Sequence, residues 1–133
     1  MSKVSLLGAG EMVVTLKADG DVNVGQPVKL TADFTAKACA DGDTISGVCV
    51  SKSGDYLGVQ LRGYLNVKYS GALNYGWQYL IADNAGGVKA ASIENPTVQS
   101  SSSGTVQVQG VLKGRQCLVT DIDSTSMLAG ILL

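Results

Sequence analysis

Two loops carry acidic residues at a spacing that could hold a cation. The frame Ala-Asp-Gly-Asp, then three further residues and Gly, occurs at 18–25 and again at 40–47. Its aspartates are Asp19 and Asp21 in the first loop and Asp41 and Asp43 in the second. Calcium loops use the same alternate spacing but supply about six to eight oxygen ligands, and neither frame continues with further acids. We therefore predict turns, in which Asp accepts a backbone hydrogen bond and Gly supplies a positive φ, with a bound cation as the alternative.

Other chemical motifs are weak. The stretch Leu6–Gly10 begins like a dinucleotide fingerprint, but the β-branched residues at 13–15 predict a strand where that fingerprint needs a helix. Histidine is absent from the chain, which removes Ser-His-Asp and Cys-His catalysis and the commonest metal ligand. The sequence thus predicts no catalytic, cofactor-binding or metal-binding residues, no cofactor and no enzyme activity.

Three cysteines are present: Cys39, Cys49 and Cys117. Their number is odd, and none forms a Cys-x-x-Cys pair. We predict reduced thiols packed as small apolar side chains, with one disulfide and one free thiol as the alternative.

Aromatic side chains alternate at Tyr75, Trp77 and Tyr79, so they share one face of a strand. This stripe could pack across neighbouring strands inside a barrel, or it could lie on the surface and contact a partner protein or a glycan. If the stripe is exposed, a subunit contact is the better interpretation.

Charge and hydropathy exclude two partner classes. Ten basic and eleven acidic residues leave a net charge of −1, without the basic cluster that phosphate neutralisation needs, so no nucleic acid is expected. The apolar tail 127–133 is far shorter than the roughly 20 residues that span a bilayer. We expect a soluble protein, made in the cytoplasm, with no membrane partner.

The elements that must position these residues are strands. Glycine contributes 17 of 133 residues, and turn signals recur every 8 to 12 residues or so, a pattern typical of all-β proteins. Alternation runs unbroken from Tyr56 to Tyr69, which predicts a long strand bent at Gly63 or two strands. Further strands are expected at 10–19, 26–34, 45–52, 75–82, 105–114 and 116–123. The apolar tail 127–133 is expected to pack as a last strand or in an oligomer contact.

Two of these strands, 105–114 and 116–123, are expected to pair with each other across Gly114-Arg115. The serine-rich segment 94–104 is expected to be an exposed loop. We predict a flexible N-terminal arm at 1–9 and a single small β-barrel domain at 10–133, built from short antiparallel strands with tight Asp/Gly turns and little helix.

Four segments carry a resemblance to a known family: GDVNVGQPVKL at 20–30, ACADGDTISGVCV at 38–50, the alternating run at 56–69 and GALNYGWQYLIADNAGGVKAA at 71–91. With these turns in this order, the chain resembles the small capsid decoration, or cement, proteins of tailed bacteriophages and prophages. The similarity extends over residues 10–91.

The resemblance implies a β-clip-like or β-tulip-like barrel that forms a homotrimer on the outside of the virion. The implied partner is the major capsid protein, whose lattice the trimer would stabilise. An N-terminal arm could add a strand to a capsid edge. The residues of that arm are Ser2, Lys3, Val4, Ser5, Leu6 and Leu7.

Two alternatives remain open. One is a carbohydrate-binding or fibre module of a phage or bacterial surface structure, which would use Tyr75, Trp77 and Tyr79. The other is a β-clip enzyme or substrate-binding domain, for which the sequence offers no cluster of carboxylates.

Overall fold

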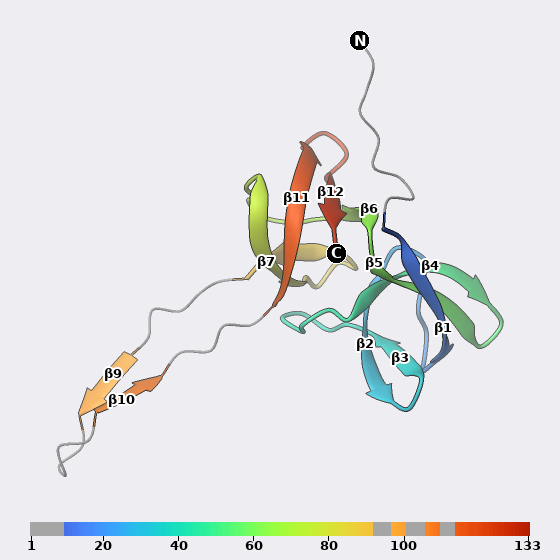
Figure 1. The fold of residues 1–133 in the computed structure, drawn as a ribbon, viewed down its shortest axis with the longest axis horizontal. Coiled ribbons are helices and arrows are strands. Elements are labelled where there is room, and N and C mark those ends of the chain that lie inside the picture. The colour runs from blue at the N-terminus through green and yellow to red at the C-terminus, as the bar shows by residue number, and fades with distance from the viewer. Residues whose placement is uncertain (1–9, 92–96, 101–105, 110–113) are drawn as a thin grey trace.

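The computed structural model describes residues 10–91, 97–100, 106–109 and 114–133. Within these ranges the chain forms strands, turns and bends without any helix (Figure 1). Strands from the first half close into a small barrel in the order β1-β3-β2-β4-β5. The predicted all-β fold built on a small barrel is confirmed. Across the described ranges, no helix is long and apolar enough to cross a membrane.

The barrel uses only the chain up to Arg62. Its strands are β1 (Met12–Ala18), β2 (Pro27–Ala32), β3 (Thr35–Ala38), β4 (Gly47–Ser53) and β5 (Tyr56–Arg62). Neighbouring strands are antiparallel, except that β1 and β3 run parallel. The sequence did not predict β3, whose residues Thr-Ala-Lys-Ala include no large β-forming side chain.

Strands from the second half form another sheet, which we call the C-terminal sheet, in the order β6-β12-β11-β7-β8. Its strands are β6 (Tyr64–Lys68), β7 (Gly76–Ala82), β8 (Val88–Ala90), β11 (Arg115–Asp123) and β12 (Leu128–Leu132). An isolated bridge between Tyr69 and Val88 joins its two edges. The sheet therefore curls around its own apolar interior. The predicted strand at the C-terminus is confirmed as β12.

Gly63 divides the alternating run Tyr56–Tyr69 between the two sheets. Its φ is 101°, a conformation that glycine adopts without the steric penalty of a Cβ. The chain thus leaves the barrel as β5 and enters the C-terminal sheet as β6, which confirms a break at this residue. The buried Gln60 side chain spans the corner, because its Nε2 donates to the carbonyls of Arg62 and Tyr64, each at 3.1 Å.

Each sheet has a hydrophobic core. The barrel core consists of Leu16, Val22, Val28, Ala36, Cys49, Leu57 and Val59. The C-terminal core includes Leu65, Val67, Leu80, Val88, Cys117, Val119 and Ile131, together with Ile45 and Val48 from the barrel side of the chain. These last two residues extend the C-terminal core to the start of β4.

Polar contacts also connect the barrel to the C-terminal sheet. The Arg115 guanidinium at the start of β11 donates to the backbone carbonyls of Ser46 and Leu61. Lys89 in β8 forms an ion pair of 2.7 Å with Asp41. The two sheets are therefore tied together at several points.

One predicted strand pairing is wrong. The strand expected at 116–123 is β11, but it lies between β7 and β12 and does not pair with the strand before it. That earlier strand, β10 (Val106–Gln109), pairs instead with β9 (Thr97–Ser100) in a two-stranded ribbon of its own (Figure 1). The prediction relied on a local turn signal at Gly114, whereas the partners of β11 lie far away in sequence.

Candidate functional site

The first acidic loop has the geometry of a turn. Gly20 has a φ of 79°, as the sequence predicted for the glycine of this frame. The Asp19 carboxylate accepts a hydrogen bond of 3.1 Å from the Thr31 hydroxyl, and the Asp19 N–H donates to the carbonyl of Ala36 at 2.8 Å. The loop therefore packs onto the hairpin of β2 and β3.

The second acidic loop uses its carboxylates for structural contacts. Gly42 has a φ of 86°. Asp43 Oδ2 accepts from the Ala40 N–H at 2.8 Å and from Lys29 Nζ at 2.6 Å, and this hydrogen bond raises the pKa of Lys29 above its ordinary value. Among the residues that the structure describes, no group of three or more His, Cys, Asp or Glu side chains is placed to hold a metal ion.

The cysteines are free thiols, as predicted, and Cys49 and Cys117 are buried. Burial raises the pKa of Cys117 to about 11, and the Arg115 charge acts in the opposite direction. Burial also raises the pKa of Cys39 to about 11, and the Asp43 carboxylate adds to this effect. These thiols stay protonated at neutral pH and are poor nucleophiles.

The aromatic stripe lies on the surface of the described structure. Tyr75 is 70% exposed and Trp77 is 66% exposed, while Tyr79 is half-buried. Packing of this stripe inside a barrel is therefore wrong for Tyr75 and Trp77. The strand that carries Trp77 and Tyr79, β7, belongs to the C-terminal sheet and turns Leu80 toward the core instead.

Strand register extends this stripe into a row across the outer face of the C-terminal sheet. Trp77 lies opposite Leu118 on β11, Leu118 opposite Leu132 on β12, and Leu132 opposite Tyr64 on β6. We call these four residues, Trp77, Leu118, Leu132 and Tyr64, the outer row. Their chain neighbours Cys117, Val119, Ile131 and Leu65 belong to the core, so by strand alternation the outer row faces away from it.

A polar group of side chains borders one end of the outer row. The Tyr64 hydroxyl donates to Asp121 Oδ1 at 2.9 Å, and the Thr120 hydroxyl contacts the same oxygen at 2.7 Å. Burial raises the pKa of Tyr64, and the hydrogen bond to Asp121 adds to the effect. Gly130 lies beneath this group, where a Cβ would collide with Asp121 and Tyr64. The outer row is thus an apolar strip with a fixed polar border, and only its Trp77 end was found from the sequence.

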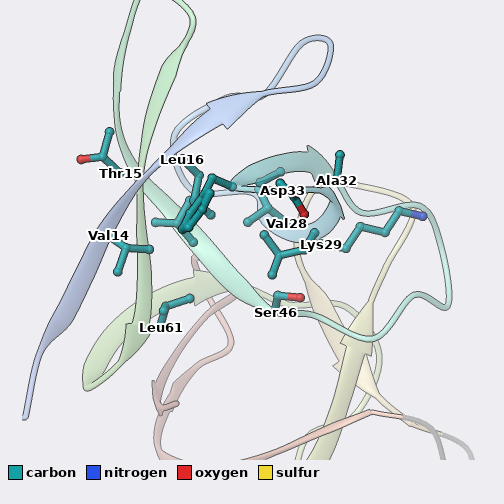
Figure 2. Close-up of a pocket in the computed structure, with 13 residues that line it drawn as sticks. Val14, Thr15, Leu16, Val28, Lys29, Ala32, Asp33, Ser46 and Leu61 are labelled. Atoms are coloured by element: carbon teal, nitrogen blue, oxygen red, sulfur yellow. The ribbon is translucent and has the colours of Figure 1, made fainter.

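A hollow of about 510 Å³ opens in the wall of the barrel (Figure 2). We call it the barrel slot. It is lined by Val14, Thr15, Leu16, Val28, Lys29, Leu30, Ala32, Asp33, Phe34, Ala36, Ser46, Val59 and Leu61. Most of these side chains are aliphatic. No sequence signal pointed to the slot, because its walls come from four of the barrel strands, β1, β2, β3 and β5, and form only when the barrel closes.

The proposed N-terminal arm, Ser2 to Leu7, lies outside the described residues. Comparison of the chain with models of protein families found no match. No curated protein matches its sequence either. The candidate sites are therefore defined by their geometry, without support from a related protein.

Proposed function

We propose that this protein is a structural decoration protein, which binds the outer surface of a phage head and stabilises the capsid lattice. The observation that carries the proposal is the outer row, in which the exposed Trp77 continues into the partly buried side chains of Leu118, Leu132 and Tyr64 on the outer face of the C-terminal sheet. The resemblance of segments 20–30, 38–50, 56–69 and 71–91 to cement proteins supplies the identity of the partner, the major capsid protein.

The composition of the outer row suits contact with a protein. Tryptophan and tyrosine are enriched at protein interfaces because each buries a large apolar area at a low cost in side-chain entropy. Exposed apolar strips with polar borders mark interaction sites on soluble proteins, and the Tyr64–Asp121 hydrogen bond provides such a border. We infer that this face docks onto a capsid subunit.

Copy number would strengthen such a contact. Many copies on one lattice, grouped as homotrimers, gain avidity without tight binding at each site. The protein would then act on the virion surface as a non-enzymatic clamp between capsid subunits.

The test is co-sedimentation with heads assembled from the major capsid protein encoded by the same genome. We expect the wild-type protein to sediment with heads and to raise their resistance to heat and to chelators. Trp77→Ala should weaken this binding by about tenfold or more, as expected for the loss of a large exposed aromatic contact. Tyr56→Ala is the matched control, because Tyr56 is an exposed aromatic of the barrel, 59% accessible, outside the outer row. A protein that stays monomeric and never sediments with heads would contradict the proposal.

The exposure of Tyr75 and Trp77 also favours a second candidate, a carbohydrate-binding or fibre module. Exposed aromatic rings can stack on the apolar faces of sugars. In a glycan-array screen this candidate predicts binding that Trp77→Ala abolishes. A screen in which Trp77→Ala changes no signal would remove it.

A further inference from the structure

The first half of β1 is paired on one side only. Residues 12–17 pair with β5, whereas β3 reaches β1 only at Lys17 and Ala18. The Ala18 N–H points toward β5 and donates to the backbone carbonyl of Asp55 at 2.7 Å. The Lys17 N–H points to the opposite side of β1 and donates to the backbone carbonyl of Phe34 at 2.8 Å. Backbone groups alternate in direction along a strand, so those of Thr15 point to the same side as those of Lys17. On that side of β1, no strand in the described part of the chain pairs with the backbone groups of Thr15.

The barrel slot lies along this unpaired edge. Val14, Thr15 and Leu16 line it from β1, while Leu30, Ala32 and Phe34 line it from the hairpin of β2 and β3. Figure 2 shows the side chains of Leu16, Val28, Ser46 and Leu61 arranged around the hollow. Proteins that bind an added strand use two features. An unpaired strand edge binds the backbone of the added strand, and an apolar hollow beside that edge receives its alternate side chains.

The slot has room for side chains of an added strand. Its volume of about 510 Å³ is comparable to that of pockets that hold small molecules, about 300 to 1,000 Å³. Phe34 is 80% exposed and Leu30 is 57% exposed, so large apolar side chains stand uncovered at its rim. Burying them would be a favourable term in binding.

The charged residues at the slot indicate the charge of the side chains on an added strand. Lys29 is held by Asp43 at 2.6 Å, and its side chain extends away from the hollow (Figure 2). The Asp33 carboxylate, at the tip of the hairpin, is exposed and has no ion-pair partner among the described residues. A basic side chain on the incoming strand would complement it.

We propose that the barrel slot binds an extended peptide segment of a partner protein. The segment adds to the free edge of β1, places aliphatic side chains in the slot and sets a lysine or arginine beside Asp33. This site lies on the barrel, away from the outer row, and it does not depend on the decoration role.

The test uses a fluorescein-labelled peptide of alternating lysine and valine, seven residues long, in an anisotropy titration. Two matched peptides are compared with it. In one, every lysine is replaced by glutamate, and in the other the central valine is replaced by proline. Amide chemical shifts of ¹⁵N-labelled protein locate the contact. The protein variants are Ala32→Trp, which fills the slot, and Asp33→Asn, with Val24→Trp as a control on an exposed loop position that does not line the slot.

We expect the lysine peptide to bind and to shift the amides of Val13 and Thr15. Ala32→Trp and the proline peptide should each weaken binding by about tenfold or more, because one removes the space and the other a backbone donor. Asp33→Asn should weaken binding of the lysine peptide by about threefold, as expected for the loss of an exposed ion pair. It should not weaken binding of the glutamate peptide. Val24→Trp should bind like the wild type.

Several results would overturn the proposal. Absence of saturable binding would do so, as would equal binding by Ala32→Trp or by the proline peptide. Binding of dodecanoate but of no peptide would assign the slot to a small apolar ligand instead. A wild-type oligomer that Ala32→Trp dissociates, again without peptide binding, would assign it to a second copy of the chain. Circular dichroism of each variant separates loss of binding from loss of fold.

Discussion

Asp83 stabilises the turn between β7 and β8 through both of its carboxylate oxygens. Oδ1 accepts from the N–H groups of Ala85 and Gly87, each at 2.8 Å, and Oδ2 accepts from the Ser70 hydroxyl at 2.9 Å. The residue is only 5% exposed. A buried carboxylate is tolerated when such donors surround it, and removing it leaves those donors unpaired.

We therefore predict that Asp83→Ala lowers the free energy of unfolding by about 3 kcal/mol, measured by urea denaturation. Asp55→Ala is the control, because Asp55 is exposed in the turn between β4 and β5 and should change stability by no more than about 0.5 kcal/mol. Equal stabilities of the two variants would contradict this account of the turn.

The buried thiols predict a pH dependence at the alkaline end. The pKa of Cys117 is raised from 9.0 to about 11 in the folded chain, so its thiol ionises first in the unfolded chain. Its contribution to stability is complete below about pH 9 and declines as pH rises toward 11. Tyr64 and Lys29 also have raised pKa values and act in the same direction. Urea denaturation at about pH 8 and at about pH 10.5 should show a smaller decline for Cys117→Ala than for the wild type. Identical declines would rule out this role for the thiol.

At the scale of elements, Gly63 lets one alternating run serve both sheets. Its φ of 101° is strained for any residue with a Cβ. Gly63→Ala should lower the free energy of unfolding by about 1 to 3 kcal/mol. Asn66→Ala, at an exposed position of β6 just beyond the break, is the control and should have little effect. A Gly63→Ala protein as stable as this control would show that the corner relaxes freely.

The strands themselves could largely be predicted from the sequence, because alternation reports burial on one face. The alternation at 56–69 predicted the strands β5 and β6 and the break between them. The apolar tail at 127–133 predicted β12. Pairing was harder, since nothing local at Gly114 indicates that β11 lies between β7 and β12. The short strands β3, β8 and β9 were missed. Strand β3 has a single β-branched residue, Thr35, and β9 lies in the serine-rich segment 94–104, where the prediction of a loop is wrong for residues 97–100.

The candidate sites divide in the same way. Alternation at Tyr75, Trp77 and Tyr79 was visible in the sequence, but whether these rings are exposed depends on which sheet β7 joins. The rest of the outer row, Leu118 and Leu132 above all, emerges only from strand register. The barrel slot depends on barrel closure, which no local pattern encodes.

At the scale of the whole molecule, Arg115 joins the C-terminal sheet to the barrel. Its guanidinium donates to the carbonyls of Ser46 and Leu61. Arg115→Met removes both donors and should lower the free energy of unfolding by about 3 kcal/mol, because the carbonyls lose charge-assisted hydrogen bonds. Arg62→Met, at an exposed position on β5, is the matched control in the same urea denaturation. A similar small loss in both variants would mean that apolar packing alone holds the two sheets together.

The central claim is that the outer row becomes covered when the protein binds a head. Trp77 is the only tryptophan in the chain, so 7-azatryptophan incorporated in its place reports this surface alone, at wavelengths that the capsid's own tryptophans do not absorb. Iodide quenching of this probe compares the free protein with the protein bound to heads. We predict strong quenching in the free protein, where the side chain is 66% exposed, and a several-fold lower quenching constant on heads. A protein that sediments with heads while its quenching stays unchanged would contradict the claim.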